Sequence, residues 1–516
     1  MRVELNVLDY LERAALVYPD RIAIVDEPSA PGSLGEITNL SLYRRARNMA
    51  KALEDMGVEQ GERVAIFSPN SAKMIVSLYG VSGFGRTIVP INFRLTPEEV
   101  TYIIEHSGAS VLLVDPDYEE HLASITVKSK IIMDGVQDAH LFGELADDGV
   151  GPKPWASDES FTCSINYTSG TTARPKGVQI THRNMWLNAA IFGWHAGVTD
   201  EDVYLHTLPL FHVNGWGMPY AITGMGGRNV ILRKVDGEEI LRRIEVEGVN
   251  FMCGAPAVWA AVLQAAEKRR AAGVEIPGRD LVRIVAAGAP PPSKTIERIE
   301  RELGWRFMQI YGLTETSPVL TFNKHRSEWD GLELEERAKL LSRAGGPVIG
   351  TRIHVDSNGE VLVKGNQVFE GYWDNPTATA DALEGGWFHT GDGGFVEDGY
   401  LTISDRKKDV IITGGENVSS IEVEDIIFQH PQVVEVAVIG VPDEKWGETI
   451  KALVVLRPDS SVTEADIVNF CRERLAHFKC PTTIEFRDEL ARTATGKLQK
   501  FKLRAPYWEG RTRLVN

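Results

Sequence analysis

The chain has 516 residues, 43% hydrophobic and 25% charged, which is typical of a globular protein long enough for two or more domains. The net charge is −17 at pH 7, so nonspecific binding to nucleic acid or to an anionic membrane is disfavoured. The four cysteines lack zinc-like spacing, and neither a signal peptide nor an apolar run of about 18 residues is found. We therefore expect a cytoplasmic location.

The first part of the chain alternates between helical and strand patterns. Apolar residues recur at helical spacing over 43–56, with Ser41 as the expected cap and Gly57 as the stop. Buried strands are expected at 63–67, 110–114 and 283–287. This alternation predicts an α/β fold of doubly wound subdomains, with ligands at the carboxyl ends of strands.

The most informative segment is 167–177, Tyr-Thr-Ser-Gly-Thr-Thr-Ala-Arg-Pro-Lys-Gly, which follows an expected strand at 163–167. Its small and hydroxyl residues let backbone N–H groups surround phosphate oxygens, and Lys176 adds positive charge. Most small polar runs are solvated turns, but the preceding strand favours phosphate binding. The residues expected to contact phosphate are Thr168, Ser169, Gly170, Thr171, Thr172 and Lys176.

This segment is not a P-loop, whose pattern is G-x-x-x-x-G-K-[ST]. Counted from Gly170, Pro175 stands where the second glycine is required and has no N–H to donate. Gly177 stands where a Ser or Thr would coordinate magnesium. The segment instead resembles the signature loop of the adenylate-forming superfamily: acyl-CoA synthetases, aryl-CoA ligases, luciferases and peptide-synthetase adenylation domains. Ala173 replaces a glycine of that loop.

A second motif, Tyr-Gly-Leu-Thr-Glu-Thr at 311–316, follows an expected strand at 308–310. A strand-end carboxylate beside a phosphate loop suits Mg²⁺, although the motif alone could be a turn with a surface acid. The resemblance implies that Tyr311, next to Gly312, stacks on adenine, that Thr314 touches the α-phosphate and that Glu315 coordinates magnesium. It also implies that the other face of the adenine is lined by Gly288, Ala289 and Pro290.

A third motif, Thr-Gly-Asp at 390–392, follows Trp387. An aspartate in a glycine-rich turn is most often a turn former. The resemblance implies instead that Asp392 and Arg406 bind the ribose hydroxyls.

Beyond residue 345 the pattern changes to short β-rich segments such as 359–365, which predict a small barrel or meander. After the charged cluster at 405–409, a compact α+β domain is predicted from a helix at 421–429, strands at 433–441 and 450–456, and a helix at 464–477. We expect an AMP-binding N-terminal domain over 1–407 and a C-terminal lid domain over 408–516.

The segment 492–497, Arg-Thr-Ala-Thr-Gly-Lys, lies in a polar loop where a lysine is usually solvated. It resembles the catalytic-lysine motif of the family, with Ala491 replacing the common proline. The resemblance implies that Lys497 neutralises charge while a carboxylate attacks the α-phosphate of ATP. It also implies that the lid then rotates about Lys408 and brings a CoA-binding segment to the site: Gly414, Gly415 and Glu416.

The segment 208–217 bears on the acid. A histidine among apolar residues is more often a packed core residue, but the resemblance implies that His212 walls the acyl pocket and responds to CoA, and that Trp216 borders the acyl tunnel. Peptide-synthetase domains carry aspartate at the position of His212 to hold an ammonium group, so amino acids are disfavoured. Aryl acids stay open. A further wall is expected from Gly254, Ala255 and Pro256.

These motifs predict an ATP-, Mg²⁺- and CoA-dependent acyl-CoA ligase acting on a fatty or short- to medium-chain acid, with Lys497, Thr168, Glu315 and His212 in catalysis. One alternative is a fatty-acyl-AMP ligase that loads a carrier protein. Another is an inactive acyl- or nucleotide-binding protein, which the retention of Lys497 argues against. No nucleic-acid partner or membrane span is expected, and a homodimer is left open.

Overall fold

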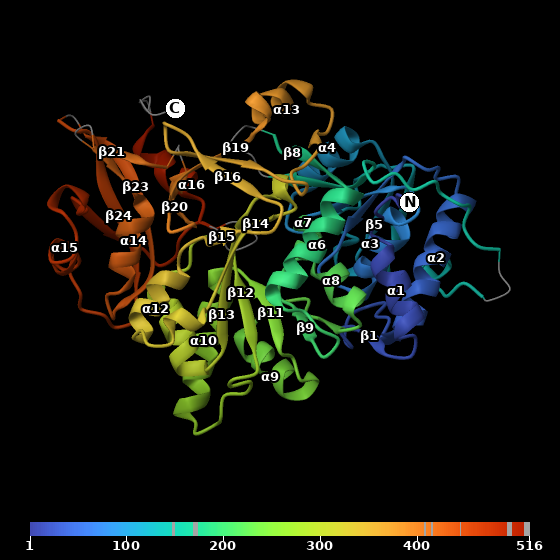
Figure 1. Cartoon of the computed structure of the whole chain (residues 1–516), viewed down its shortest axis with the longest axis horizontal. Helices are drawn as coiled ribbons and strands as arrows, with labels where there is room; N and C mark the ends of the chain where they lie inside the picture. Colours follow the sequence, from blue (N-terminus) through green and yellow to red (C-terminus); the bar gives the residue numbers. More distant parts are fainter. Residues whose placement is uncertain are drawn as a thin grey trace.

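The computed structural model describes residues 1–146, 150–168, 174–406, 409–413, 416–443, 445–492 and 498–509. Its strands form two large and two small sheets. The N-terminal elements lie at one end of the molecule and the C-terminal elements at the other (Figure 1). The mixed α/β architecture, with a large N-terminal part and a smaller C-terminal part, is the one predicted.

The first large sheet has seven strands and a parallel centre. The strand β3 (Arg63–Phe67), apolar from its second residue on, pairs in parallel with its neighbours on both sides. The strands in spatial order are β18 (Gly371–Tyr372), β8 (Lys176–Thr181), β7 (Thr162–Thr168), β4 (Thr87–Ile91), β3, β5 (Ala109–Val114) and β6 (Ser129–Ile132).

The second large sheet has nine strands, of which the central ones are parallel. In spatial order they are β15 (Gly346–Pro347), β14 (Val319–Lys324), β13 (Arg306–Gly312), β12 (Arg283–Ala286), β11 (Phe251–Gly254), β9 (Val203–His206), β10 (Arg228–Ile231), β1 (Ile22–Val25) and β2 (Glu36–Thr38). Since parallel strands end at the same edge, the segments after β9, β11, β12 and β13 meet there.

Helices cover both faces of each large sheet, as predicted for doubly wound subdomains. One core joins both sheets to α2 (Asn39–Asp55), α3 (Ala72–Ser82), α6 (His182–Ala196) and α8 (Met218–Met225). The opposite faces are covered by α4 (Pro97–Ser107) on the first sheet and by α9 (Gly237–Glu247), α10 (Pro256–Ala271) and α11 (Ser293–Arg298) on the second.

The expected cap of the first long helix was wrong. The helix α2 begins earlier than the apolar periodicity, and the Thr38 hydroxyl, not that of Ser41, caps it by accepting a hydrogen bond from the Ser41 backbone N–H at 3.2 Å.

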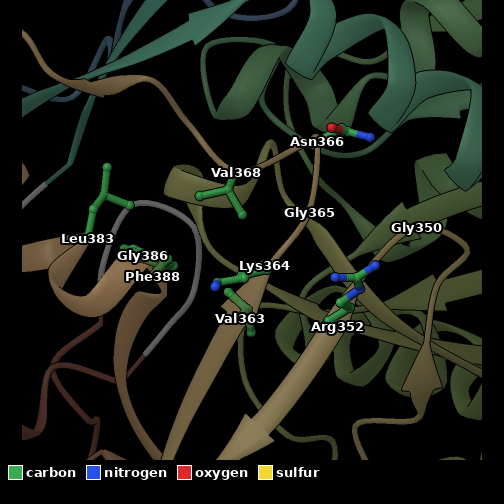
Figure 2. A pocket seen from close by; sticks show the side chains of 10 residues that line it. All are labelled: Gly350, Arg352, Val363, Lys364, Gly365, Asn366, Val368, Leu383, Gly386 and Phe388. Atoms are coloured by element: carbon green, nitrogen blue, oxygen red, sulfur yellow. The ribbon is translucent and has the colours of Figure 1, made fainter.

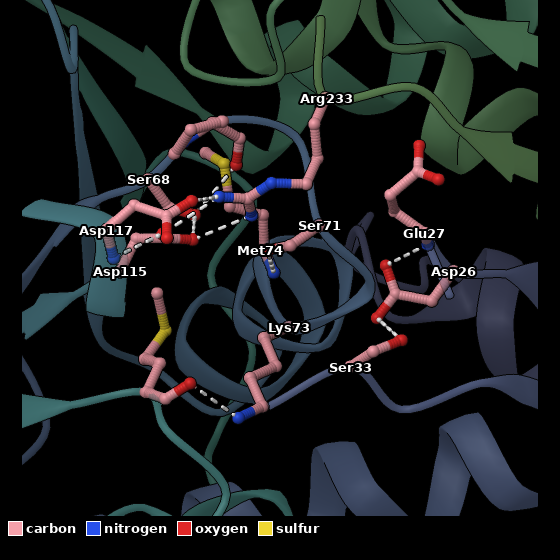
Figure 3. Close-up of polar contacts among 12 residues, drawn as sticks. Asp26, Glu27, Ser33, Ser68, Ser71, Lys73, Met74, Asp115, Asp117 and Arg233 are labelled. Atoms are coloured by element: carbon pink, nitrogen blue, oxygen red, sulfur yellow. Dashed lines mark hydrogen bonds and ion pairs between the residues drawn. The ribbon is translucent and has the colours of Figure 1, made fainter. Parts of the chain in front are cut away.

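A bidentate ion pair connects the carboxyl-end loops of the two large sheets (Figure 3). Arg233, after β10, donates through both terminal nitrogens to the Asp115 carboxylate at 2.9 Å, and its Nη2 also lies 2.7 Å from Asp117 Oδ2. The hydroxyl of Ser68, which follows β3, donates to Asp115 Oδ2 at 2.9 Å. These contacts fix the edge of one sheet against the edge of the other.

The remaining strands form two small sheets. The predicted β-rich region is a four-stranded antiparallel meander of β16 (Arg352–Val355), β17 (Glu360–Lys364), β19 (Phe388–Glu397) and β20 (Tyr400–Arg406). The C-terminal sheet contains β21 (Ile411–Thr413), β22 (Glu416–Val418), β23 (Val433–Asp443), β24 (Gly447–Leu456) and β25 (Thr483–Phe486), with α14 (Ser420–Phe428), α15 (Glu464–Arg472) and α16 (Lys500–Arg504).

The helix predicted to reach residue 477 ends at Arg472 instead. Ala476 adopts an extended ψ of 142°, which separates α15 from a short 3₁₀ turn at His477–Lys479. Within the described ranges, no helix combines the length and apolar character needed to cross a membrane.

Candidate active site

The predicted phosphate segment connects two paired strands. Thr168, the last residue of β7, is the register partner of Lys176, the first residue of β8. Ser169, Gly170, Thr171 and Thr172 lie outside the described residues. The described part therefore shows Thr168 and Lys176 side by side where the segment leaves and rejoins the sheet.

Glu315 lies close to this hairpin. It sits in a 3₁₀ turn (Thr314–Thr316) after β13, and its Oε1 accepts a hydrogen bond from the Tyr372 hydroxyl at 2.9 Å. The strand β18 places Tyr372 beside β8, and the Lys176 Nζ lies 4.7 Å from the centroid of the Tyr372 ring. Tyr372 thus connects the proposed magnesium ligand to the proposed phosphate lysine.

Burial raises the pKa of Glu315, because removal from water penalises the charged carboxylate; the Tyr372 hydroxyl, Arg406 and Lys176 act in the opposite direction. A nearby cation would stabilise the charged form of such a desolvated carboxylate. No cluster of three or more metal-ligating side chains occurs among the described residues. Mg²⁺ commonly binds through one or two carboxylates together with substrate phosphates, so the single carboxylate of Glu315 fits a magnesium ion carried by a nucleotide.

The predicted adenine and ribose contacts meet in one cluster. The Tyr311 hydroxyl donates to Asp392 Oδ2 at 2.8 Å, and Arg406 Nε lies 3.6 Å from Asp392 Oδ1. Asp392 and Arg406 are register partners across β19 and β20. Burial and the adjacent Asp392 carboxylate raise the pKa of Tyr311 well above its usual value, so the phenol stays protonated and donates.

Glycine is required at position 312 for steric reasons. A Cβ there would lie 1.6 Å from the Pro318 carbonyl oxygen, so any side chain would displace the backbone that follows the 311–316 motif. Thr314 is buried in this bend. The bend therefore holds Tyr311 and Glu315 in fixed relation to each other.

The other predicted segments follow neighbouring parallel strands. Gly288, Ala289 and Pro290 come after β12, next to β13 and its Tyr311. Gly254 ends β11, Ala255 connects it to α10, and Pro256 begins α10; a Cβ on Gly254 would lie 2.9 Å from the Trp259 ring. His212 and Trp216 come after β9, which pairs with β11. The proposed acid segments and nucleotide segments thus share one sheet edge.

His212 is half-buried and Trp216 is buried. Both belong to the segment around α7 (Val213–Trp216), whose backbone is left-handed: Asn214 has φ/ψ of 48°/48° and Gly215 of 59°/35°. Sequence reasoning missed this conformation, because valine and tryptophan disfavour positive φ and nothing in the local pattern signals it.

The C-terminal predictions fall largely outside the described residues: Lys408, Gly414, Gly415 and Lys497. Glu416 is exposed on β22 and pairs with Thr413. Arg492 and Leu498 form an isolated antiparallel bridge, so the chain on either side of the lysine segment is held together.

A hollow of about 420 Å³ lies elsewhere, beside the small meander (Figure 2). Its lining includes Arg352, Lys364 and Phe388, and none of the residues predicted to bind nucleotide, acid or CoA. The described cavity is therefore not the predicted acyl pocket.

The hairpin of Thr168 and Lys176, the half-buried Glu315 and the Tyr311–Asp392–Arg406 cluster form the arrangement expected of an adenylate-forming enzyme. The sequence model of the AMP-binding enzyme matches residues 11–373, and that of the AMP-binding enzyme C-terminal domain matches residues 422–497. The chain belongs to the AMP-binding enzyme family.

Relatives of this chain are CoA ligases. It is 38% identical to 4-hydroxybutyrate–CoA ligase 2 of Metallosphaera sedula, over 97% of this chain and 94% of the relative. It is 36% identical to 2-methylpropanoate–CoA ligase of Humulus lupulus, with the same coverage. The fold matches the anthranilate CoA ligase AuaEII in complex with anthranoyl-AMP, with a TM-score of 0.87, 27% identity and 98% of each chain covered. The protein is an acid–thiol ligase of this family.

Proposed function

We propose that this ligase acts on a short- or medium-chain carboxylic acid in two half-reactions. The carboxylate attacks the α-phosphate of ATP, forming acyl-AMP and releasing pyrophosphate. The thiol of CoA then attacks the acyl carbonyl, forming the thioester and releasing AMP. The observation that carries the proposal is the shared sheet edge: Tyr311, which bonds to Asp392, and Glu315 lie at the carboxyl end of β13, and the segment of His212 follows β9 of the same sheet.

In this proposal the nucleotide is held along that edge. Asp392 and Arg406 bind the ribose, Tyr311 and the segment 288–290 enclose the adenine, and Thr168 and Lys176 contact phosphate together with residues 169–172. Glu315 would hold Mg²⁺, which when bound neutralises phosphate charge. Thr314, buried beside Glu315, would contact the α-phosphate.

The C-terminal part acts as a lid in this proposal, with its boundary after residue 407. Lys497 supplies positive charge during adenylation and withdraws by rotation about Lys408. Gly414, Gly415 and Glu416 then border the path of CoA. Hinge motion of short segments between domains is a common way to separate two steps.

The class of acid substrate is proposed from the names of the relatives and from the side chain at His212. The two curated relatives act on 4-hydroxybutyrate and 2-methylpropanoate, and His212 offers no carboxylate to hold the ammonium group of an amino acid. The neighbour bound to anthranoyl-AMP keeps aryl acids as a second candidate.

The four cysteines are free and buried, which fits a reducing compartment such as the cytoplasm.

The test is pyrophosphate release with ATP and Mg²⁺ on butanoate, 4-hydroxybutanoate, 2-methylpropanoate, octanoate and anthranilate, with and without CoA. We expect acid-dependent release, and thioester when CoA is present. Release without thioester would contradict CoA as the acceptor and favour a carrier protein. No release with any acid would contradict the proposal and favour a binding protein.

A further inference from the structure

The segment with His212 and Trp216, which are proposed to contact the acid substrate, contains a left-handed turn. Its φ angles are 45° at Val213, 48° at Asn214, 59° at Gly215, 60° at Trp216 and 78° at Gly217. The Gly215 N–H donates to the His212 carbonyl at 3.1 Å, and the Gly217 N–H donates to the Asn214 carbonyl at 3.3 Å. β-Branched and bulky residues avoid this region, so the surroundings must impose the turn.

Asn214 ties the start of the turn to the strand that leads to the phosphate segment. The Asn214 side chain is fully buried, and its Oδ1 lies 3.2 Å from the Ser164 hydroxyl and 3.3 Å from Asn166 Nδ2. Asn166 Nδ2 also donates to the Phe211 carbonyl at 3.2 Å. Ser164, Asn166 and Thr168 alternate along β7, so they share one face of that strand.

Asn188 ties the end of the turn to the segment after the 311–316 motif. Its Nδ2 donates to the Trp216 carbonyl at 3.1 Å, and its Oδ1 accepts from the Val319 N–H at 3.1 Å. Val319 begins β14, three residues after Thr316. A Cβ on Gly217 would lie 2.6 Å from Asn188 Nδ2, so glycine leaves room for this bridge.

We propose that Asn214 and Asn188 are positioning residues that select the length of the acid. They hold the left-handed turn between the strand that carries Thr168 and the strand that follows Glu315, and so set the distance of Trp216 from the phosphate segment. This inference rests on the proposed function, in which Trp216 and His212 wall the acid pocket. Neither asparagine needs to touch the substrate, because each holds the turn in place and the turn positions Trp216.

The test compares kcat/KM for pyrophosphate release with butanoate, hexanoate and octanoate. The ratio between two acids does not depend on the fraction of folded enzyme, so general destabilisation leaves it unchanged. Asn214→Gly keeps the tolerance of positive φ and removes the side chain with its amide. We expect it to change the ratio between the best acid and its homologue two methylenes longer by about tenfold, the scale of such discrimination in apolar pockets.

A matched control is Asn39→Ala, which removes another buried asparagine, one that donates to the carbonyls of Tyr18 and Arg21. We expect its ratio to stay within about twofold of the wild type, since it lies outside the site. Ser164→Ala removes only the hydroxyl that contacts Asn214, a smaller loss of side chain than Asn214→Gly. It should shift the ratio of kcat/KM values in the same direction as Asn214→Gly. Should Asn214→Gly not fold, Ser164→Ala decides.

Unchanged ratios in Asn214→Gly and Ser164→Ala would overturn the positioning role. A crystal structure of Asn214→Ala that retains all five left-handed residues, with Trp216 in place, would overturn it independently of activity. By contrast, a wild-type protein that released no pyrophosphate with any acid would count against the proposed function, and the crystal structure would still decide whether Asn214 holds the turn.

Discussion

Glu315 combines two properties that rarely favour stability. Its carboxylate is desolvated, which raises its pKa. Its side chain accepts a hydrogen bond from the Tyr372 hydroxyl and lies near the more distant charges of Lys176 and Arg406. A group in such surroundings is better explained by a cation that arrives with the substrate than by folding. Stability is commonly sacrificed in this way at functional sites.

Glu315→Gln should therefore separate stability from activity. The amide keeps an oxygen that accepts from Tyr372 but removes the charge, so kcat for pyrophosphate release should fall about 100-fold. At pH 7 the carboxylate is charged in the unfolded state, and the raised pKa means that the folded state is penalised relative to it. The nucleotide-free variant should thus melt at a higher temperature than the wild type, and a lower melting temperature would contradict this reasoning.

The raised pKa of Glu315 also predicts how the activity depends on pH. A raised pKa means that Glu315 takes up a proton at a higher pH than an ordinary glutamate, whose value is 4.5, so the acid limb of kcat/KM for ATP should lie above that value. Because Mg²⁺ and the proton compete for the carboxylate, more Mg²⁺ should move the limb to lower pH. A limb that does not respond to Mg²⁺ would remove Glu315 as the ligand.

At the scale of the element, the proposed function has Trp216 on α7, with its left-handed turn, wall the acid pocket. We expect Trp216→Ala to alter the preference among butanoate, hexanoate and octanoate, because loss of the indole lengthens the pocket. The matched control is Trp305→Ala, which removes a buried core tryptophan directly before β13, at the sheet edge opposite the proposed site. An acid profile equal to the wild type in Trp216→Ala would exclude this side chain from the pocket.

Elements with a continuous apolar run could be predicted to the residue, as β3 at 63–67 shows, since burial on both faces leaves a clear pattern. The start of α2 was missed because its first turn lacks that periodicity. The contact of Tyr372 with Glu315 spans 57 residues of sequence, and it depends on β18 pairing with β8, which no local pattern reports. The motifs at 311–316 and 390–392 could be predicted as site residues, but their meeting could be inferred only by resemblance.

At the scale of the whole molecule, the site depends on a fixed relative position of the two large sheets. Arg233 is mostly buried, at 14% side-chain exposure, and it pairs with the nearly inaccessible Asp115, at 4%. Bidentate pairs of this kind are geometrically specific. The ion pair lies between loops that follow β10 and β5, so it fixes the sheet that carries β9 and β13 relative to the sheet that carries the phosphate hairpin.

Arg233→Met should lower the free energy of unfolding by about 3 kcal/mol, because the buried Asp115 carboxylate loses its cationic partner. Urea denaturation, followed through the first cooperative transition, measures this. Arg242→Met is the matched control, since its ion pair with Glu239 is exposed and should contribute less than about 1 kcal/mol. Equal effects of the two substitutions would show that the Arg233 pair does not hold the sheets together.

The lid proposal also belongs to this scale. Lys497→Ala should abolish acyl-AMP formation yet leave thioester formation from supplied acyl-AMP largely intact, because the lysine is needed only while pyrophosphate departs. Both half-reactions can be followed separately with purified acyl-AMP. Equal loss of the two would contradict a lysine that withdraws between steps.

The most direct test of the central claim is the fate of the acid's oxygen. With ¹⁸O in both carboxylate oxygens, ATP and CoA, adenylation makes one labelled oxygen bridge carbon and phosphorus. Attack by the thiol on the carbonyl then breaks the carbon–oxygen bond, so AMP should carry one ¹⁸O, as read by mass spectrometry. Thioester formation with unlabelled AMP, or with the label in inorganic phosphate, would contradict an acyl-adenylate intermediate.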